Sequence, residues 1–118
     1  MEYVIDVEAT TLGNDNFRWV FQTSKQLQYV FMSLLPKQDI GEEIHPITTQ
    51  FIRIESGTGL AIVGGEKYYL NSKSSVFIPA GTKHNIINTG AQEMKLYTLY
   101  SPPQHKQGLV QKYKPLED

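Results

Sequence analysis

The chain has 118 residues, of which 40% are hydrophobic and 19% are charged, so it is long enough for one domain with a real core and has a globular composition. Its formal net charge is −1, from 11 basic and 12 acidic residues, and without a basic face it is a poor candidate for binding nucleic acid. Because it contains no cysteine, disulfides and thiolate zinc sites are excluded.

The part of the chain before Pro36 predicts three strands. Residues 2–9 (EYVIDVEA) predict an opening strand, residues 12–16 (LGNDN) a turn, and residues 17–22 (FRWVFQ) a second, short strand. Residues 26–35 (QLQYVFMSLL) are apolar on both faces, as in a strand that is buried on both sides, and Pro36 ends this run.

Six further short runs rich in β-branched and aromatic residues follow, separated by turn-forming clusters such as SGTG and NSKS. The Gly64-Gly65 pair suits a hairpin turn, because glycine accepts positive φ values. The predicted strands of this part are residues 50–55, 59–63, 66–71, 75–79, 85–89 and 94–100.

The composition changes after Tyr100. Residues 101–118 are rich in proline and charge, and we expect an extended tail that packs on the barrel or on a neighbouring subunit. Nine or so strands in one small domain leave edges that need protection, and closure into a barrel provides it. The sequence therefore predicts a single all-β domain over residues 1–118, with a barrel core at about 25–100 and very little helix.

Several polar side chains have the parity of inward-facing positions in this barrel. Side chains two residues apart in a strand share a face, so Glu43 and His45 point the same way. Gln50 shares its face with Ile52 and Ile54, which are cheaper to bury than the alternating set that contains Arg53 and Glu55. By the same rule, His84 shares its face with Ile86. Four inward polar groups need partners, and one divalent cation would satisfy all of them.

Two motifs in the chain resemble those of the cupin family. Its second motif reads Pro-x-Gly-x-x-His-x-x-x-Asn, and PAGTKHNIIN supplies Pro79, Gly81, His84 and Asn88. Its first motif fits EIHPITTQFIRIESG, with Glu43 in place of the first histidine, His45 as the second, Gln50 in place of the glutamate, and Gly57 closing the turn. Lys37 and Lys73 stand where each motif usually has its leading glycine.

The resemblance covers residues 36–88 and implies a single-domain cupin β-barrel, that is, a jelly roll or double-stranded β-helix. The chain looks most like the small cupins labelled as relatives of mannose-6-phosphate isomerase, whose activity is mostly unassigned. Carried over position by position, the resemblance implies metal ligands at Glu43, His45, Gln50 and His84, with Glu43 as the candidate proton-transfer residue. Such donors favour Mn²⁺, Fe²⁺, Ni²⁺ or Zn²⁺ over Ca²⁺.

Each candidate also has a purely structural interpretation. His45 precedes Pro46 and could be an exposed loop histidine, whereas His84 could be a core histidine bonded to backbone. Gln50 could be an ordinary buried amide, or it could bond a metal-bound water and leave Glu43, His45 and His84 as the ligands. The other polar residues of interest are expected to be structural: one of Glu42 and Glu43 is solvated, Pro79 and Gly81 serve a turn, Asn88 fixes local backbone, and His105 lies at the surface.

Three functions fit this pattern. The first is a metalloenzyme that acts on a small polar molecule, such as a sugar or sugar-phosphate isomerase, although only Lys83 and Arg53 are near in sequence to bind phosphate. The second is an Fe²⁺-dependent dioxygenase, and the third is a binding protein without turnover. The sequence does not distinguish them.

The remaining expectations concern location and partners. No run approaches 18 apolar residues and the N-terminus does not have the pattern of a signal peptide, so we expect a cytoplasmic protein without a membrane partner. The expected partners are a small-molecule ligand and, by the family resemblance, a second copy in a homodimer.

Overall fold

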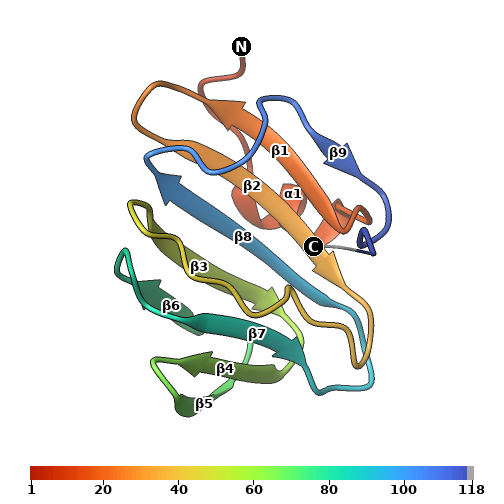
Figure 1. Cartoon of the computed structure of the whole chain (residues 1–118). Helices are drawn as coiled ribbons and strands as arrows, with labels where there is room; N and C mark the ends of the chain where they lie inside the picture. The colour runs from red at the N-terminus through yellow and green to blue at the C-terminus, as the bar shows by residue number, and fades with distance from the viewer. Residues whose placement is uncertain (117–118) are drawn as a thin grey trace.

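A computed structural model describes residues 1–116, and in this range it contains one helix and nine strands (Figure 1). The helix comes first in the chain and the strands follow it. Their bounds are α1 Val7–Gly13, β1 Arg18–Thr23, β2 Gln28–Leu34, β3 Thr49–Ser56, β4 Gly59–Val63, β5 Glu66–Leu70, β6 Ser75–Ile78, β7 His84–Asn88, β8 Met94–Ser101 and β9 Val110–Gln111. No helix in the described residues is long and apolar enough to cross a membrane.

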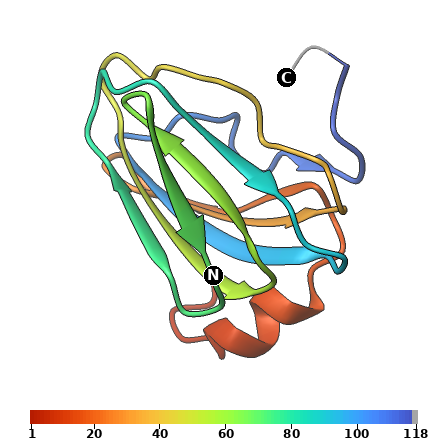
Figure 2. The ribbon, with the colours of Figure 1, turned by 90° about the horizontal axis from the view of Figure 1, so that it is seen from below.

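The strands form two antiparallel sheets that face each other (Figure 2). The larger sheet has the order β6-β3-β8-β2-β1-β9, and the smaller has the order β5-β4-β7. The segment after β2 extends the smaller sheet through bridges from Asp39 to Ile87 and from Glu43 to His84. The apolar core fills the space between the sheets and includes Val20, Val30, Met32, Leu34, Ile52, Ile54, Ala61, Ile86 and Leu96.

Eight of the nine predicted strands form, because their alternating patterns match the two faces of a sheet. In β3, Gln50, Ile52 and Ile54 are buried, whereas the alternate residues are only partly buried. In β2 every residue from Val30 to Leu34 is buried, which confirms that this strand is covered on both faces. The all-β fold predicted from the sequence is confirmed.

The predicted opening strand at residues 2–9 is wrong, since the chain forms α1 there instead. The alternation of EYVIDVEA suggested an extended chain, but Asp6 acts as an N-cap and its carboxylate accepts a hydrogen bond from the Ala9 backbone N–H at 3.0 Å. The hydroxyl of Thr11 donates to Val7 O at 2.6 Å, so this buried threonine is satisfied inside the helix. Local capping therefore outweighs the strand pattern.

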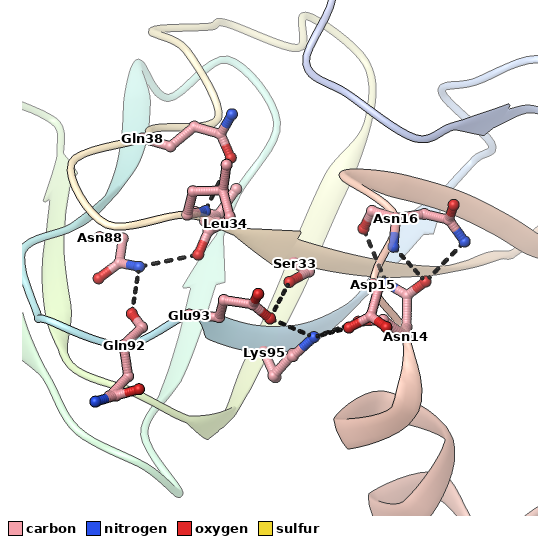
Figure 3. Close-up of polar contacts among 11 residues, drawn as sticks. Asn14, Asp15, Asn16, Ser33, Leu34, Gln38, Asn88, Gln92, Glu93 and Lys95 are labelled. Carbon is pink, nitrogen blue, oxygen red and sulfur yellow. Dashed lines mark hydrogen bonds and ion pairs between the residues drawn. The ribbon is translucent and has the colours of Figure 1, made fainter.

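Lys95 fixes the end of α1 to the larger sheet, on the side away from the smaller sheet (Figures 2 and 3). Its Nζ donates to Asn14 O at 2.6 Å and lies 2.9 Å and 2.8 Å from carboxylate oxygens of Asp15 and Glu93. Burial acts to lower the pKa of Lys95, but these two carboxylates outweigh it and raise the pKa above its ordinary value. The lysine is therefore charged, and it holds the helix against the sheet.

The tail packs on its own barrel, which was one of the two predicted arrangements. Strand β9 pairs with β1 at the edge of the larger sheet, and the backbone N–H of Val20 donates to Leu109 O at 2.8 Å. Further along, Lys114 Nζ lies 2.6 Å from Asp39 Oδ1 in the segment after β2. The predicted tail also included residues 117 and 118, which lie outside the described residues.

Asn88 holds the end of the second motif in place, as predicted (Figure 3). Its side chain is fully buried, and Nδ2 donates to Leu34 O at 2.9 Å and to Gln92 O at 2.8 Å. Its Oδ1 accepts a hydrogen bond from the Gly90 N–H at 2.9 Å. These bonds join the ends of β2, β7 and the loop before β8.

The two lysines that replace the leading motif glycines adopt the conformation that glycine prefers. Lys37 has φ 73° and Lys73 has φ 76°, both in the left-handed region. The Lys73 N–H donates to Ile54 O at 2.7 Å, so the fold imposes this conformation on the residue. The motif's backbone geometry is thus retained while its glycines are not.

Lys73→Gly should therefore raise the free energy of unfolding by about 0.5–1 kcal/mol, because glycine reaches positive φ without the steric penalty. Urea denaturation would measure this change. Lys67→Gly is the matched control: this lysine is also exposed but lies within β5, so its replacement should lower the free energy by about 0.5–1 kcal/mol. Destabilisation by both substitutions would contradict the interpretation.

Candidate functional site

Glu43 and His84 are brought together by the backbone. They form an isolated antiparallel bridge, with the Glu43 N–H donating to His84 O and the His84 N–H donating to Glu43 O, both at 2.9 Å. Residues that exchange both hydrogen bonds lie directly opposite each other, and their side chains leave the same face of the sheet. The segment after β2 and strand β7 thus place a carboxylate beside an imidazole.

His45 joins this pair from two residues further along. Its Nε2 lies 3.9 Å from Glu43 Oε2, and its ring centroid lies 5.1 Å from that of His84. Both histidines are only 4% exposed, so the exposed-loop interpretation of His45 is wrong. The Glu43 side chain is 29% exposed and forms the more open side of the group.

The imidazole of His84 has a defined orientation. Its Nδ1 lies 2.9 Å from Thr82 O, and because a carbonyl only accepts, Nδ1 must carry the proton. In the neutral ring Nε2 then carries the lone pair, which is the arrangement found in histidines that bind metals. The structural interpretation of His84 required a hydrogen bond to the backbone. The same hydrogen bond leaves Nε2 as the nitrogen that can bind a metal.

Gln50 is buried and belongs to β3 of the larger sheet, opposite the smaller sheet that carries His84. Its Nε2 donates to Thr98 Oγ1 at 3.0 Å, whereas its Oε1 is buried and has no hydrogen-bond partner among the described residues. Leaving a buried acceptor unsatisfied costs about 1–3 kcal/mol. The amide is thus fixed by one contact and leaves its oxygen available to a cation or a water.

The protonation state of His45 suits the role of a metal ligand. Burial lowers the pKa of His45 below its ordinary value, and the positive charges of His84, in its protonated form, and of Arg18 lower it further. The imidazole is therefore neutral at neutral pH, which is the form that binds metal.

The four predicted ligands fit a transition metal by donor chemistry, but their donor atoms lie farther apart than those of a bound metal ion. Two donors bound to one ion at about 2.1 Å lie about 3.0–3.4 Å apart, slightly closer than Glu43 and His45 are. Across residues 1–116, no three His, Asp or Glu side chains already have the spacing of a metal site. The ligand set of Glu43, His45, Gln50 and His84 stays a prediction.

The residues expected to lie outside the site do so. Glu42 pairs with Lys83 at 3.3 Å, and both side chains are more than half exposed. Arg53 pairs with Glu55 at 2.8 Å on the outward face of β3. The two cations that the sequence offered for phosphate binding are therefore both directed away from Gln50 and the histidines.

Sequence reasoning missed the part of the site that the tail supplies. The ring of Tyr100 lies 6.0 Å from that of His45, and the ring of His105 lies 5.0 Å from that of Tyr100. His105 was expected at the surface, but it is partly buried. No pattern in PPQHKQ predicts this, because the position depends on how the tail folds back.

Gln28 holds the tail against the barrel. This fully buried residue of β2 donates from Nε2 to His105 O at 2.7 Å. Its Oε1 accepts hydrogen bonds from the backbone N–H groups of His105 at 2.8 Å and Gln104 at 3.1 Å. One side chain thus satisfies three backbone groups of the tail beside Tyr100.

A cluster of aromatic residues lies away from the site. Tyr29 and Tyr97, whose rings are 5.9 Å apart, belong to a cluster on the outward face of the larger sheet together with Trp19, Phe21 and Phe31. Among Tyr29, Phe31, Tyr97 and Tyr100, it is Tyr100 whose ring lies beside a predicted ligand, His45. The predicted homodimer stays a prediction.

Comparison with known proteins places this fold and motif set in a family. The sequence pattern described as Cupin domain matches residues 30–100, which is more than half of the chain. This chain belongs to the cupin family. The small-cupin resemblance noted in the sequence is confirmed at the level of the family, and the match includes every predicted ligand of this cupin.

Two relatives of this cupin are uncharacterized proteins. YrkC from Bacillus subtilis is 42% identical over 118 residues, covering 95% of this chain but only 63% of YrkC. L612 from Acanthamoeba polyphaga mimivirus is 45% identical over 117 residues, covering 96% of this chain and 73% of L612. The crystal structure of BH2720 from Bacillus halodurans is similar with a TM-score of 0.92 at 39% identity, covering 95% of this chain and 89% of that one.

Gln28→Ala should loosen the tail of this cupin. Amide hydrogen exchange at Gln104 and His105 should accelerate by about tenfold or more, because each lost hydrogen bond contributes about 1 kcal/mol. The amide of Ala61 in β4 is the internal reference, and Gln26→Ala, at an exposed position nearby, is the control variant. Unchanged exchange at both tail amides would show that Gln28 does not hold this segment.

Proposed function

We propose that this protein holds a divalent transition metal through Glu43, His45, Gln50 and His84, and that it is an enzyme acting on a small polar molecule. The observation that carries the proposal is the backbone bridge between Glu43 and His84, which sets a carboxylate beside two buried imidazoles. Mn²⁺, Fe²⁺, Ni²⁺ and Zn²⁺ all accept such a set. When bound, the ion supplies Lewis acidity toward a carbonyl or hydroxyl oxygen.

The residues around this centre have distinct roles. Glu43, partly open to solvent, is the group that can move a proton to or from a bound molecule. The Thr82 carbonyl orients His84, and Thr98 orients Gln50. Tyr100, backed by the tail, packs against His45 and limits access of water from that side.

The reaction we favour is an isomerisation of a carbonyl compound of the sugar type, in which proton transfer by Glu43 moves a hydrogen between adjacent carbons. A sugar phosphate is the weaker substrate candidate, because Lys83 is paired with Glu42 and Arg53 is paired with Glu55.

An Fe²⁺-dependent dioxygenase is the second candidate. If Gln50 only bonds a metal-bound water, then Glu43, His45 and His84 form a two-histidine, one-carboxylate set, which leaves positions for O₂ and substrate. A binding protein without turnover is the third candidate, and it requires the coordination to be complete. Activity with Mn²⁺ or Zn²⁺ under argon would support the isomerase and exclude the dioxygenase.

Elemental analysis of protein purified without added metal tests the site itself. The parent should carry about one equivalent of a transition metal, and His84→Ala should lose it by at least tenfold, as removal of a direct ligand does. His105→Ala is the matched control, since it removes the third histidine but no predicted ligand, and should retain the metal. A parent that neither carries metal nor binds it on titration would refute all the metal-dependent functions together.

A further inference from the structure

Two edge strands border an open cleft between the sheets. Strand β5 is an edge of the smaller sheet and β6 is an edge of the larger one, and residues 71–74 connect them in the chain (Figure 2). The cleft between them has a volume of about 380 Å³. Since a cavity of about 150 Å³ is enough to hold benzene, this space suits a molecule of one or two rings.

Small side chains on β4 create the space. The inward positions of this strand are Gly59, Ala61 and Val63, whereas much of the core is built from Ile, Leu and Met. A Cβ atom at Gly59 would overlap the side chain of Met94, so the gap at that position is already filled. The space beside Ala61 stays open and forms the inner end of the cleft.

The inner walls of the cleft are aliphatic and uncharged. Ala61, Leu70 and Val76 line it and are all buried, and none of the described residues that line it carries a charge. A charged molecule would lose hydration here without gaining a counter-charge, and a sugar would place hydroxyl groups against walls that cannot bond them. The inner end therefore favours an uncharged, apolar group.

The outer walls are aromatic. Tyr68 lies directly opposite Ala61 in the ladder between β4 and β5, so its ring leaves the same face of the sheet. It is 54% exposed because β5 has no neighbour on its other side. Tyr69 and Phe77 also border the cleft and are exposed. Aromatic rings in contact are stabilised beyond the area that they bury, so an aromatic ring fits this opening better than an aliphatic one.

Ser74 supplies a polar group at the cleft. Its Oγ accepts a hydrogen bond from the Asn71 N–H at 2.9 Å, and its backbone carbonyl accepts one from the Ile54 N–H at 2.9 Å, so the hydroxyl has a fixed place. The hydroxyl proton of Ser74 is bonded to no other group of residues 1–116. It can therefore be donated to an oxygen of a bound molecule.

We propose that this cleft binds a neutral phenol of one or two rings. The ring lies between Tyr68 and the aliphatic walls, and the phenol oxygen accepts a hydrogen bond from Ser74. The inference goes beyond the proposed function, because no predicted metal ligand lines the cleft and β4 separates β5 from β7, the strand that carries His84.

Methyl carbon-13 NMR of the full chain without added metal tests the site. Titrated 4-ethylphenol should shift the methyl signals of Ala61, Leu70 and Val76 with saturation, because its ring lies against them. The methyl signals of Val30, a core residue of β2, should stay in place.

Three further probes test the class of ligand. The charged analogue 4-hydroxybenzoate should bind at least tenfold more weakly than 4-ethylphenol, because the cleft offers its carboxylate no cation. The saturated analogue 4-ethylcyclohexanol should bind at least threefold more weakly, since it lacks the aromatic ring. Methyl glucoside should leave the three methyl signals unmoved.

Two variants with matched controls test the walls. Tyr68→Ala should weaken the binding of 4-ethylphenol at least fivefold, whereas Tyr113→Ala, which removes an exposed tyrosine of the tail, should not. Ser74→Ala should weaken it about fivefold, because one neutral hydrogen bond contributes about 1 kcal/mol, whereas Ser72→Ala in the same turn should not. If a variant does not fold, the NMR titration of the parent still decides the question.

The proposal would be overturned by methyl signals that 4-ethylphenol does not move to saturation, by parent-like affinity in both Tyr68→Ala and Ser74→Ala, or by equal binding of the glucoside. Shifts of the same signals that depend on protein concentration without any probe would also overturn it, since a second copy would then cover the cleft. Because no metal is added, a chain that fails to load metal would refute the proposed function and leave this result separately readable.

Discussion

The cost of burying polar side chains is the constraint on which this structure depends. Between the two sheets, most inward positions carry Val, Ile, Leu or Met, and the interior excludes the water that polar groups would otherwise bond. His45, Gln50, His84 and Arg18 are buried nevertheless. Thr82 bonds His84, Thr98 bonds Gln50 and Gln111 bonds Arg18, so that these three side chains are held in fixed directions.

Backbone pairing, more than side-chain packing, assembles this group. The bridge between the segment after β2 and strand β7 sets Glu43 opposite His84, and Asn88 ties the far end of β7 to the end of β2. The backbone also sets the turns at Lys37 and Lys73. Both lysines have the positive φ that glycine favours, although the leading glycines of the motifs are absent. The tail completes the arrangement by placing Gln111 against Arg18 and His105 against Tyr100.

The sequence predicts the strands and the inward face well, because both follow from a two-residue period that burial enforces. Gln50 and His84 were placed correctly from the apolar neighbours that share their face. Arg18 was missed for the same reason: in β1 it alternates with Trp19 and Phe21, so the pattern favours an inward aromatic face, whereas the larger sheet turns those two rings outward. The helix at residues 7–13 depends on the Asp6 cap, and the place of the tail depends on the buried Gln28, contacts that no local period reveals.

The central claim is that side chains from separate segments hold one ion between the two sheets. Anomalous diffraction at the zinc edge, from crystals grown with Zn²⁺, tests it most directly. The account predicts one strong peak about 2.0–2.2 Å from imidazole nitrogens of both His45 and His84 and from the Glu43 carboxylate. A peak at surface residues alone, or no peak between the sheets in well-ordered crystals, would contradict it.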